Sequence, residues 1–128
     1  MEYYFSKTLE TSFDEAIQKT IEALKTEGFG VISEINIHEK LKEKLNVDFR
    51  RYKILGACNP SYAYKALQAE DKIGTMLPCN VIVQELSESR IEIAAVNPIA
   101  SMMAIQNPAL AGIAKEITTK LQSVINAI

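Results

Sequence analysis

Apolar residues at helical spacing predict one long helix near each end of the chain. In the first helix the apolar positions share one face, and Ser12 with Glu15 has the spacing of a capping box, in which each residue satisfies a backbone N–H of the first turn. The second helix opens with Pro108, which tolerates the first helical position because that position needs no N–H donor. We therefore expect helices over 12–27 and 108–127.

Shorter apolar segments with strand-like composition alternate with polar turns between these two helices. The polar segment 87–90 joins two such segments, and a loop this short makes its flanking strands antiparallel. Asn36 and Asn59 stand where helix caps are wanted, which predicts further helices over 36–45 and 60–70, and a single helical turn fits 99–105. The expected strands are 3–9, 29–35, 52–57, 73–77, 79–86 and 91–96.

The mixture of helices and antiparallel strands predicts an α+β domain. We expect a twisted antiparallel sheet with the long helices packed on one of its faces. A chain of 128 residues is large enough to form a core without disulfide bonds or metal ions, and it shows no linker or repeat. A single domain over 1–128 is therefore the expected organisation.

Charge and hydropathy exclude several classes of function. The net charge is −2 and basic residues are interspersed with acidic ones, whereas nucleic-acid binding needs a clustered basic face. A small anionic ligand stays possible, because a helix N-terminus can hold one. No apolar run reaches the ~20 residues that span a bilayer, and the first residues lack the features of a signal peptide. We expect a cytoplasmic protein whose two cysteines are reduced.

Both cysteines lie in similar local motifs. Cys58 ends an expected strand and is followed by Asn59 and Pro60, and Cys79 lies between Pro78 and Asn80. Cys58 therefore stands at a strand-to-helix junction, where the helix dipole favours a thiolate. Free cysteines beside strand ends are also common as small buried residues that only pack, and both interpretations stay open.

These motifs carry a resemblance to a known family. The segments 55–60 and 77–81, supported by 28–31, 45–49 and 95–103, resemble the bacterial and archaeal family called domain of unknown function 302. The resemblance implies an α+β fold of the TATA-binding-protein-like kind and a homodimer, and it implies no activity, substrate or cofactor. It also implies an acidic residue at positions 36 and 97, where this chain has asparagine.

We expect a binding module rather than an enzyme, with a small-ligand site near Cys58, Asn59, Cys79 and Asn80, whose amides both donate and accept hydrogen bonds. The rival hypothesis is a thiol-based redox enzyme that uses Cys58 with Cys79 as the resolving thiol. No histidine or basic residue adjoins either cysteine to activate it, which favours binding. The sequence assigns no catalytic residue, and it contains no hydrolase triad or phosphate-binding loop.

A metal centre within one chain is not expected, because the two cysteines and the single His38 lack metal-site spacing. His38 is expected on the solvated side of its helix. A metal shared between two subunits stays open, since a dimer doubles the ligands.

Two further expectations concern distant contacts. The uncharged segment 99–105 carries more apolar surface than a short connection needs, so we expect a symmetric homodimer through this segment or the sheet edge beside it. We also expect Cys58 and Cys79 to be neighbours in space, because the chain between them is long enough to return.

Overall fold

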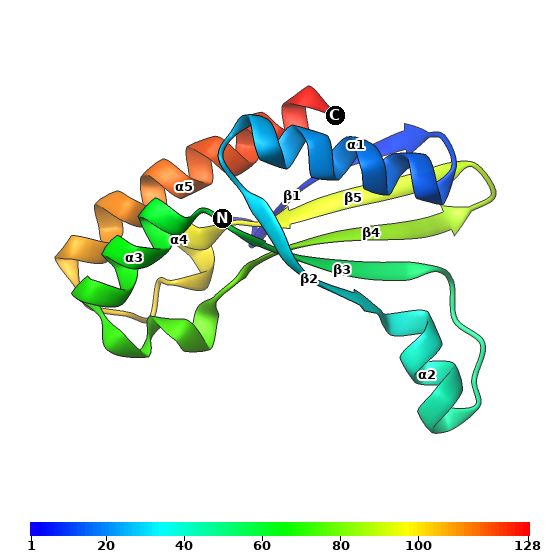
Figure 1. Cartoon of the computed structure of the whole chain (residues 1–128), viewed down its shortest axis with the longest axis horizontal. Coiled ribbons are helices and arrows are strands. Elements are labelled where there is room, and N and C mark those ends of the chain that lie inside the picture. Colours follow the sequence, from blue (N-terminus) through cyan, green and yellow to red (C-terminus); the bar gives the residue numbers. More distant parts are fainter.

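The computed structural model describes all 128 residues as one five-stranded antiparallel sheet with helices (Figure 1). The strand order is β1-β5-β4-β3-β2, so the hairpin β4–β5 lies in the middle and β1 and β2 form the two edges. The strands are β1 (Tyr4–Glu10), β2 (Gly30–Asn36), β3 (Tyr52–Cys58), β4 (Cys79–Ser87) and β5 (Arg90–Val96). The helices are α1 (Phe13–Thr26), α2 (Ile37–Leu45), α3 (Pro60–Ala69), the 3₁₀ helix η1 (Asp71–Met76), α4 (Pro98–Ser101) and α5 (Pro108–Ala127).

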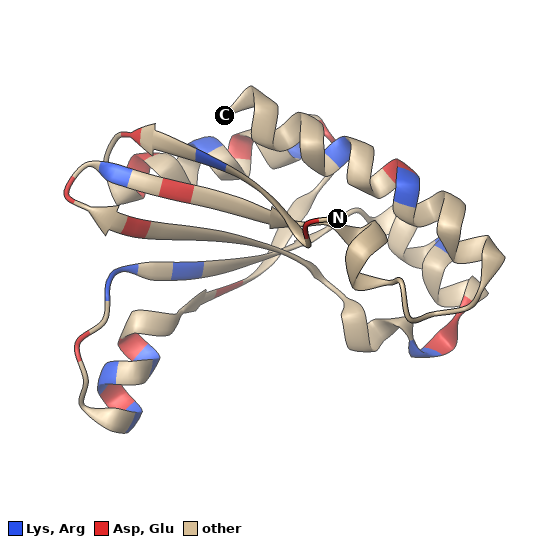
Figure 2. Ribbon diagram, turned by 180° about the vertical axis from the view of Figure 1, so that it is seen from behind, with Lys and Arg blue, Asp and Glu red and all other residues tan.

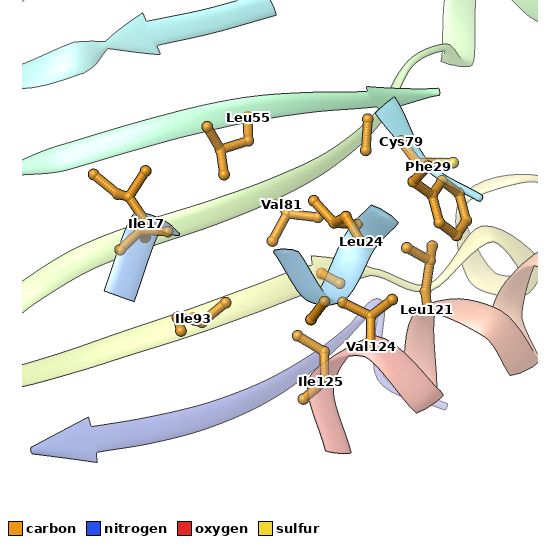
Figure 3. Packing of buried hydrophobic residues seen from close by; sticks show 14 of the residues in the cluster. Ile17, Leu24, Phe29, Leu55, Cys79, Val81, Ile93, Leu121, Val124 and Ile125 are labelled. Atoms are coloured by element: carbon orange, nitrogen blue, oxygen red, sulfur yellow. The ribbon is translucent and has the colours of Figure 1, made fainter. Parts of the chain in front are cut away.

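The two long helices cover the same face of the sheet, as the apolar spacing predicted, and the α+β architecture is confirmed (Figure 1). Their apolar faces meet alternate residues of the central strands, because side chains of a strand point to opposite faces in turn. The resulting core holds 18 buried residues, and Figure 3 shows Leu24 beside Val81 of the sheet, with Leu121 and Val124 on the neighbouring helix. No helix is long and apolar enough to cross a membrane.

Side-chain caps begin the two long helices, whereas the predicted cap at position 36 makes no such bond to α2. Ser12 Oγ accepts the N–H of Glu15 at 3.1 Å at the start of α1. Asn107 Oδ1 accepts the N–H of Ala109 at 3.1 Å and so caps α5, and its amide also donates to Ala69 O at 2.8 Å. The last bond holds the start of α5 against the end of α3, so one residue fixes both a helix start and a tertiary contact.

The other face of the sheet carries no helix across its centre, and α2 projects from its far end (Figure 1). α2 has no buried residue. It is attached through His38, whose Nδ1 accepts the N–H of Tyr52 at 2.9 Å and whose ring meets the edge of Phe13. The expectation of a solvated His38 is therefore wrong: the ring is half-buried and joins α2 to β3.

A second, smaller hydrophobic cluster lies beyond the end of the sheet, between α3, η1, α4 and α5, and its buried residues are Ala66, Ile73 and Leu110. One expectation fails here. Residues 73–77 do not form a strand, because 71–76 close into a 3₁₀ helix that buries Ile73. α3 packs against α5 and η1.

The segment 99–105 belongs mainly to this second cluster. Met102 and Ile105 pack against its buried residues, and Ile99 is half-buried. Only Met103, at 70% exposure, presents a large apolar side chain to solvent. Most of the apolar surface that suggested an interface is therefore used within the chain.

Asn97 is the one buried amide side chain and joins three segments. It is 6% exposed, its Oδ1 accepts the N–H of Ile99 at 3.1 Å, and its Nδ2 donates to Glu2 O at 3.0 Å. An aspartate would keep the cap but would lose the donor and bring a carboxylate against the carbonyl of Glu2. Replacement Asn97→Asp restores the acidic residue that the family resemblance implied, and here it is expected to destabilise.

We predict that Asn97→Asp lowers the free energy of unfolding by about 1–3 kcal/mol at pH 7, the cost of leaving a buried acceptor unsatisfied. The loss should shrink at pH 4, because a protonated carboxyl can donate to Glu2 O. Urea denaturation of both proteins at the two pH values measures this. An equal loss at both values would show that the charge at position 97 does not matter.

Candidate functional site

A cavity of about 340 Å³ separates the main core from the second cluster. Its walls come from both sides: Phe29, Ala57 and Cys79 belong to the core, and Ala66 and Met102 belong to or pack against the smaller cluster. Of the 18 lining residues 14 are hydrophobic and none is charged. The lining residues are Phe29, Ile32, Ala57, Cys58, Asn59, Tyr62, Ala63, Ala66, Leu67, Gly74, Leu77, Pro78, Cys79, Pro98, Met102, Ile113, Ala114 and Ile117.

Small side chains leave this space unfilled. Ala57 at the end of β3, Ala63 and Ala66 on α3 and Ala114 on α5 all face the cavity, and none carries more than a methyl group. Interiors are otherwise packed to crystal-like density. The cavity opens to solvent near Ile32 and Leu67, which are 65% and 44% exposed, so a ligand could enter past the edge strand.

Both cysteines line this cavity, in agreement with the expectation that they lie near each other. In the β3–β4 ladder Ala57 pairs with Cys79, and Cys58 is the next residue of β3. Both thiols are free. Cys58 is half-buried, whereas Cys79 is 8% exposed, and in Figure 3 the Cys79 side chain lies beside the Phe29 ring.

The two thiols differ in their chemistry. Burial, and to a smaller extent the neighbouring Cys58, raises the pKa of Cys79 from 9.0 to about 11. A thiolate is the nucleophilic form, so Cys79 is a protonated, poorly reactive group at neutral pH. Cys58 is the more accessible thiol of the pair.

The polar groups of the cavity lie together where β3 passes into α3. Cys58, Asn59 and Tyr62 are found there. Asn59 was expected to cap α3, but its side chain makes no capping bond. Its Nδ2 donates instead to Glu27 O at 3.2 Å, beside Gly28, whose φ of +83° needs a residue without a side chain. Pro60 begins α3 and has no N–H, so the free backbone N–H groups of this first turn are those of residues 61 and 62, which have no side-chain partner.

Charged groups lie just outside the wall, around Tyr62. The ammonium groups of Lys65 and Lys120 are 5.4 and 5.9 Å from the centre of its ring. The neighbouring Glu116 carboxylate, as hydrogen-bond acceptor, and burial raise the pKa of the Tyr62 phenol. Lys120 also pairs with Glu27 at 3.9 Å. The two positive and two negative groups balance, so this rim has no preference for an ion of either sign.

Asn80 does not join the other three predicted site residues. It pairs with Gly56 and points to the open face of the sheet, where it lines a second, more polar hollow. There a hydrogen bond of 2.8 Å joins Arg50 to Gln84 and one of 2.7 Å joins Gln84 to Glu92. Cys58, Asn59 and Cys79 thus line the same cavity. Asn80 is separated from them, because it follows Cys79 in β4 and its side chain lies on the opposite face of the sheet from that of Cys79.

The contribution of the C-terminal third to the cavity wall was not predicted from the sequence. Pro98 and Met102 from the α4 region, with Ile113, Ala114 and Ile117 from α5, form one side of the cavity. Asn-Pro pairs at 97–98 and 107–108 marked where these helices begin. These Asn-Pro pairs did not indicate which face of each helix would line the cavity. The structure contains no group of three or more His, Cys, Asp or Glu side chains that could hold a metal ion.

We predict that iodoacetamide labels Cys58 at pH 7 while Cys79 stays unlabelled in the folded protein. Because the pKa of Cys79 is about 11, its thiolate fraction, and with it the labelling rate, should rise about tenfold per pH unit between pH 8 and 10. Peptide mass spectrometry of Cys58→Ser measures the Cys79 rate alone, and unfolded protein gives the reference. Rapid labelling of Cys79 at pH 7 would contradict its burial.

Comparison with known proteins gives a family but no activity. The family model described as "Domain of unknown function DUF302" matches residues 5–128, and no curated protein matches the chain. The crystal structure of an uncharacterized conserved DUF302 protein from Bacillus stearothermophilus is 30% identical, with a TM-score of 0.90 over 99% of this chain and 98% of that one. Because the family model matches residues 5–128 and the related structure matches nearly the whole length of the fold, the chain belongs to the DUF302 family.

Proposed function

We propose that this protein binds one small, uncharged, largely apolar molecule in the cavity between α3, α5 and the end of the sheet. The observation that carries the proposal is the lining, in which 14 of 18 residues are hydrophobic and none is charged. Ligand pockets of proteins are concave, mainly apolar and carry a few placed polar groups. Here those polar groups are Cys58, Asn59 and Tyr62, all at one end.

The cavity volume limits the size of the molecule. A cavity of about 150 Å³ in another protein holds benzene, and this one measures about 340 Å³. It suits a bicyclic ring system or a medium-length hydrocarbon chain with one polar end. An ionised head inside would lose its hydration without an opposite charge to replace it, which supports an uncharged ligand.

We predict that the neutral dye N-phenyl-1-naphthylamine binds the protein with one saturable site and enhanced fluorescence. Ala63→Phe adds a ring to a half-buried residue of the cavity wall and should weaken binding at least about tenfold, since it removes burial worth more than ~1.4 kcal/mol. Gln68→Phe adds the same ring on the exposed side of α3 and is the matched control.

Circular dichroism and thermal unfolding of both variants exclude a folding defect as the cause. If the dye fails to bind, or binds equally to Ala63→Phe and Gln68→Phe, the cavity is not a binding site and the proposal is wrong.

The proposal includes a homodimer. Exposed apolar side chains gather on the edge strand β2 and on the arm formed by residues 37–51, with Leu45 at 66%, Val47 at 43% and Phe49 at 41% exposure. The arm carries five basic and three acidic residues, whereas the rest of the chain carries nine basic and thirteen acidic ones (Figure 2). The arm of one copy and the rest of a second copy have opposite net charge, which supports a symmetric pair in which each arm packs against the other chain outside its arm.

We predict that the protein sediments as a dimer and that Leu45→Glu with Phe49→Glu turns it into a monomer by placing charges in the apolar contact. Met103→Glu is the control. It tests segment 99–105, the interface expected from the sequence, at its one strongly exposed apolar residue. A concentration-independent monomer at high micromolar wild-type protein would refute the dimer, and dissociation by Met103→Glu alone would return the interface to that segment.

A thiol-based redox enzyme that uses Cys58 and Cys79 is the second candidate. The cavity supports it by bordering both free thiols. The raised pKa of Cys79, about 11, weighs against it, because a resolving thiol must attack as a thiolate. In the cytoplasm, where we place this protein, a reducing thiol pool keeps both cysteines free for ligand contact.

A further inference from the structure

We propose that the ligand is an apolar α,β-unsaturated aldehyde or ketone and that Cys58 adds covalently to it inside the cavity. The inference rests on the proposed function, since it needs the cavity to hold the apolar chain. It goes further in naming the ligand's chemical class and in making Cys58 the site of a covalent bond.

The arrangement of the polar groups carries the inference. A long-chain enal has a carbonyl at one end, a reactive β-carbon two bonds away and an apolar chain beyond it. The cavity has the same order: Asn59 and the uncapped start of α3 at one end, Cys58 directly beside them, and only apolar walls farther in. A carbonyl bound at the start of α3 would direct the β-carbon, two bonds farther along the ligand, towards Cys58, which immediately precedes Asn59 in the chain.

The donors at this end suit the charge that develops during addition. As the sulfur attacks, negative charge moves to the carbonyl oxygen as an enolate, and backbone N–H groups at a helix start stabilise such an oxyanion. The Asn59 side chain leaves these groups free because it bonds to Glu27 O instead. One of its two amide hydrogens is used in that bond, so the second can also donate.

The reaction balances without a further reagent. The Cys58 sulfur forms a bond to the β-carbon, the electrons of the carbon–carbon double bond move to the α-carbon, and the thiol proton ends on that carbon. No group leaves and nothing is oxidised or reduced. The product is a thioether that still carries its carbonyl.

Cys79 is an internal control for the addition. It is an unpaired thiol only 8% exposed, and it borders the same cavity from the adjacent strand. Burial holds its proton in place, because it raises the pKa to about 11. Addition is therefore directed to Cys58, and Cys79 contributes a soft apolar wall.

The test measures the rate of adduct formation with trans-2-alkenals of five to nine carbons by intact-mass spectrometry at pH 7. If the chain is buried, each added methylene should raise the second-order rate about fourfold until the cavity is full, which is the factor for ~0.8 kcal/mol per buried CH₂. Glutathione and urea-unfolded protein provide the reference series, in which chain length has little effect. Peptide mapping should place the adduct on Cys58 alone.

Four variants make the outcome specific. Cys58→Ser should abolish the adduct and Cys79→Ser should keep it. Ala63→Phe should remove the dependence on chain length, and Gln68→Phe, on the exposed side of α3, should preserve it. An adduct on Cys79, or a rate independent of chain length, overturns the inference.

Nonanal separates this inference from the proposed function, because it has the same chain and carbonyl but no double bond. Displacement of the naphthylamine dye by nonanal, together with the absence of any nonenal adduct, leaves the binding function standing and refutes the covalent step. Absence of dye binding, with an adduct rate that does not change with chain length, refutes both.

Discussion

Burial of one sheet face beneath α1 and α5 is the interaction on which the rest of the structure depends. The central strands supply fully buried residues such as Val83, Ile91 and Ile93, and the helices supply Leu24 and Leu121. Burial of each such side chain is worth about 1.5–3 kcal/mol, and together they fix the sheet register. Both long helices pack on that one face. The opposite face therefore has no helix across its centre, and α2 has no buried residue. The cavity lies at the end of the sheet, where the core stops and the second cluster begins.

Local patterns in the sequence predicted most of the fold because they have local causes. The cap bonds of Ser12 and Asn107 are made within one helical turn, although the Glu15 carboxylate accepts from the Thr11 hydroxyl and does not return the bond to Ser12. The hairpin between β4 and β5 follows from the short polar loop. The strand predicted over 73–77 was wrong. Apolar residues such as Ile73 and Met76 are typical of a strand, but the burial of Ile73 in the second cluster determines the conformation of this segment. A single chain segment does not contain that information.

The candidate site was predictable only in part, for the same reason. Cys58 and Asn59 could be placed at a strand-to-helix junction from the sequence alone, and strand pairing brought Cys79 to the same place. Asn80 was misplaced because its motif resembles that of Cys58, although its side chain points to the other face. The cavity wall formed by α5 could not be predicted from the sequence. A cavity forms where small side chains from different elements leave a gap, and this depends on how the elements pack.

The course of α5 has a consequence for the cooperativity of folding. Its first turns hold Leu110 in the second cluster, and its later turns hold Leu121 and Val124 in the main core. The cavity lies between these two clusters, so they are connected through α5 and the few residues around the cavity. Local unfolding of the second cluster need not disrupt the main core, so the chain can unfold in two steps. A molecule that fills the cavity would contact both the main core and the second cluster, so that the two would unfold together in one cooperative step.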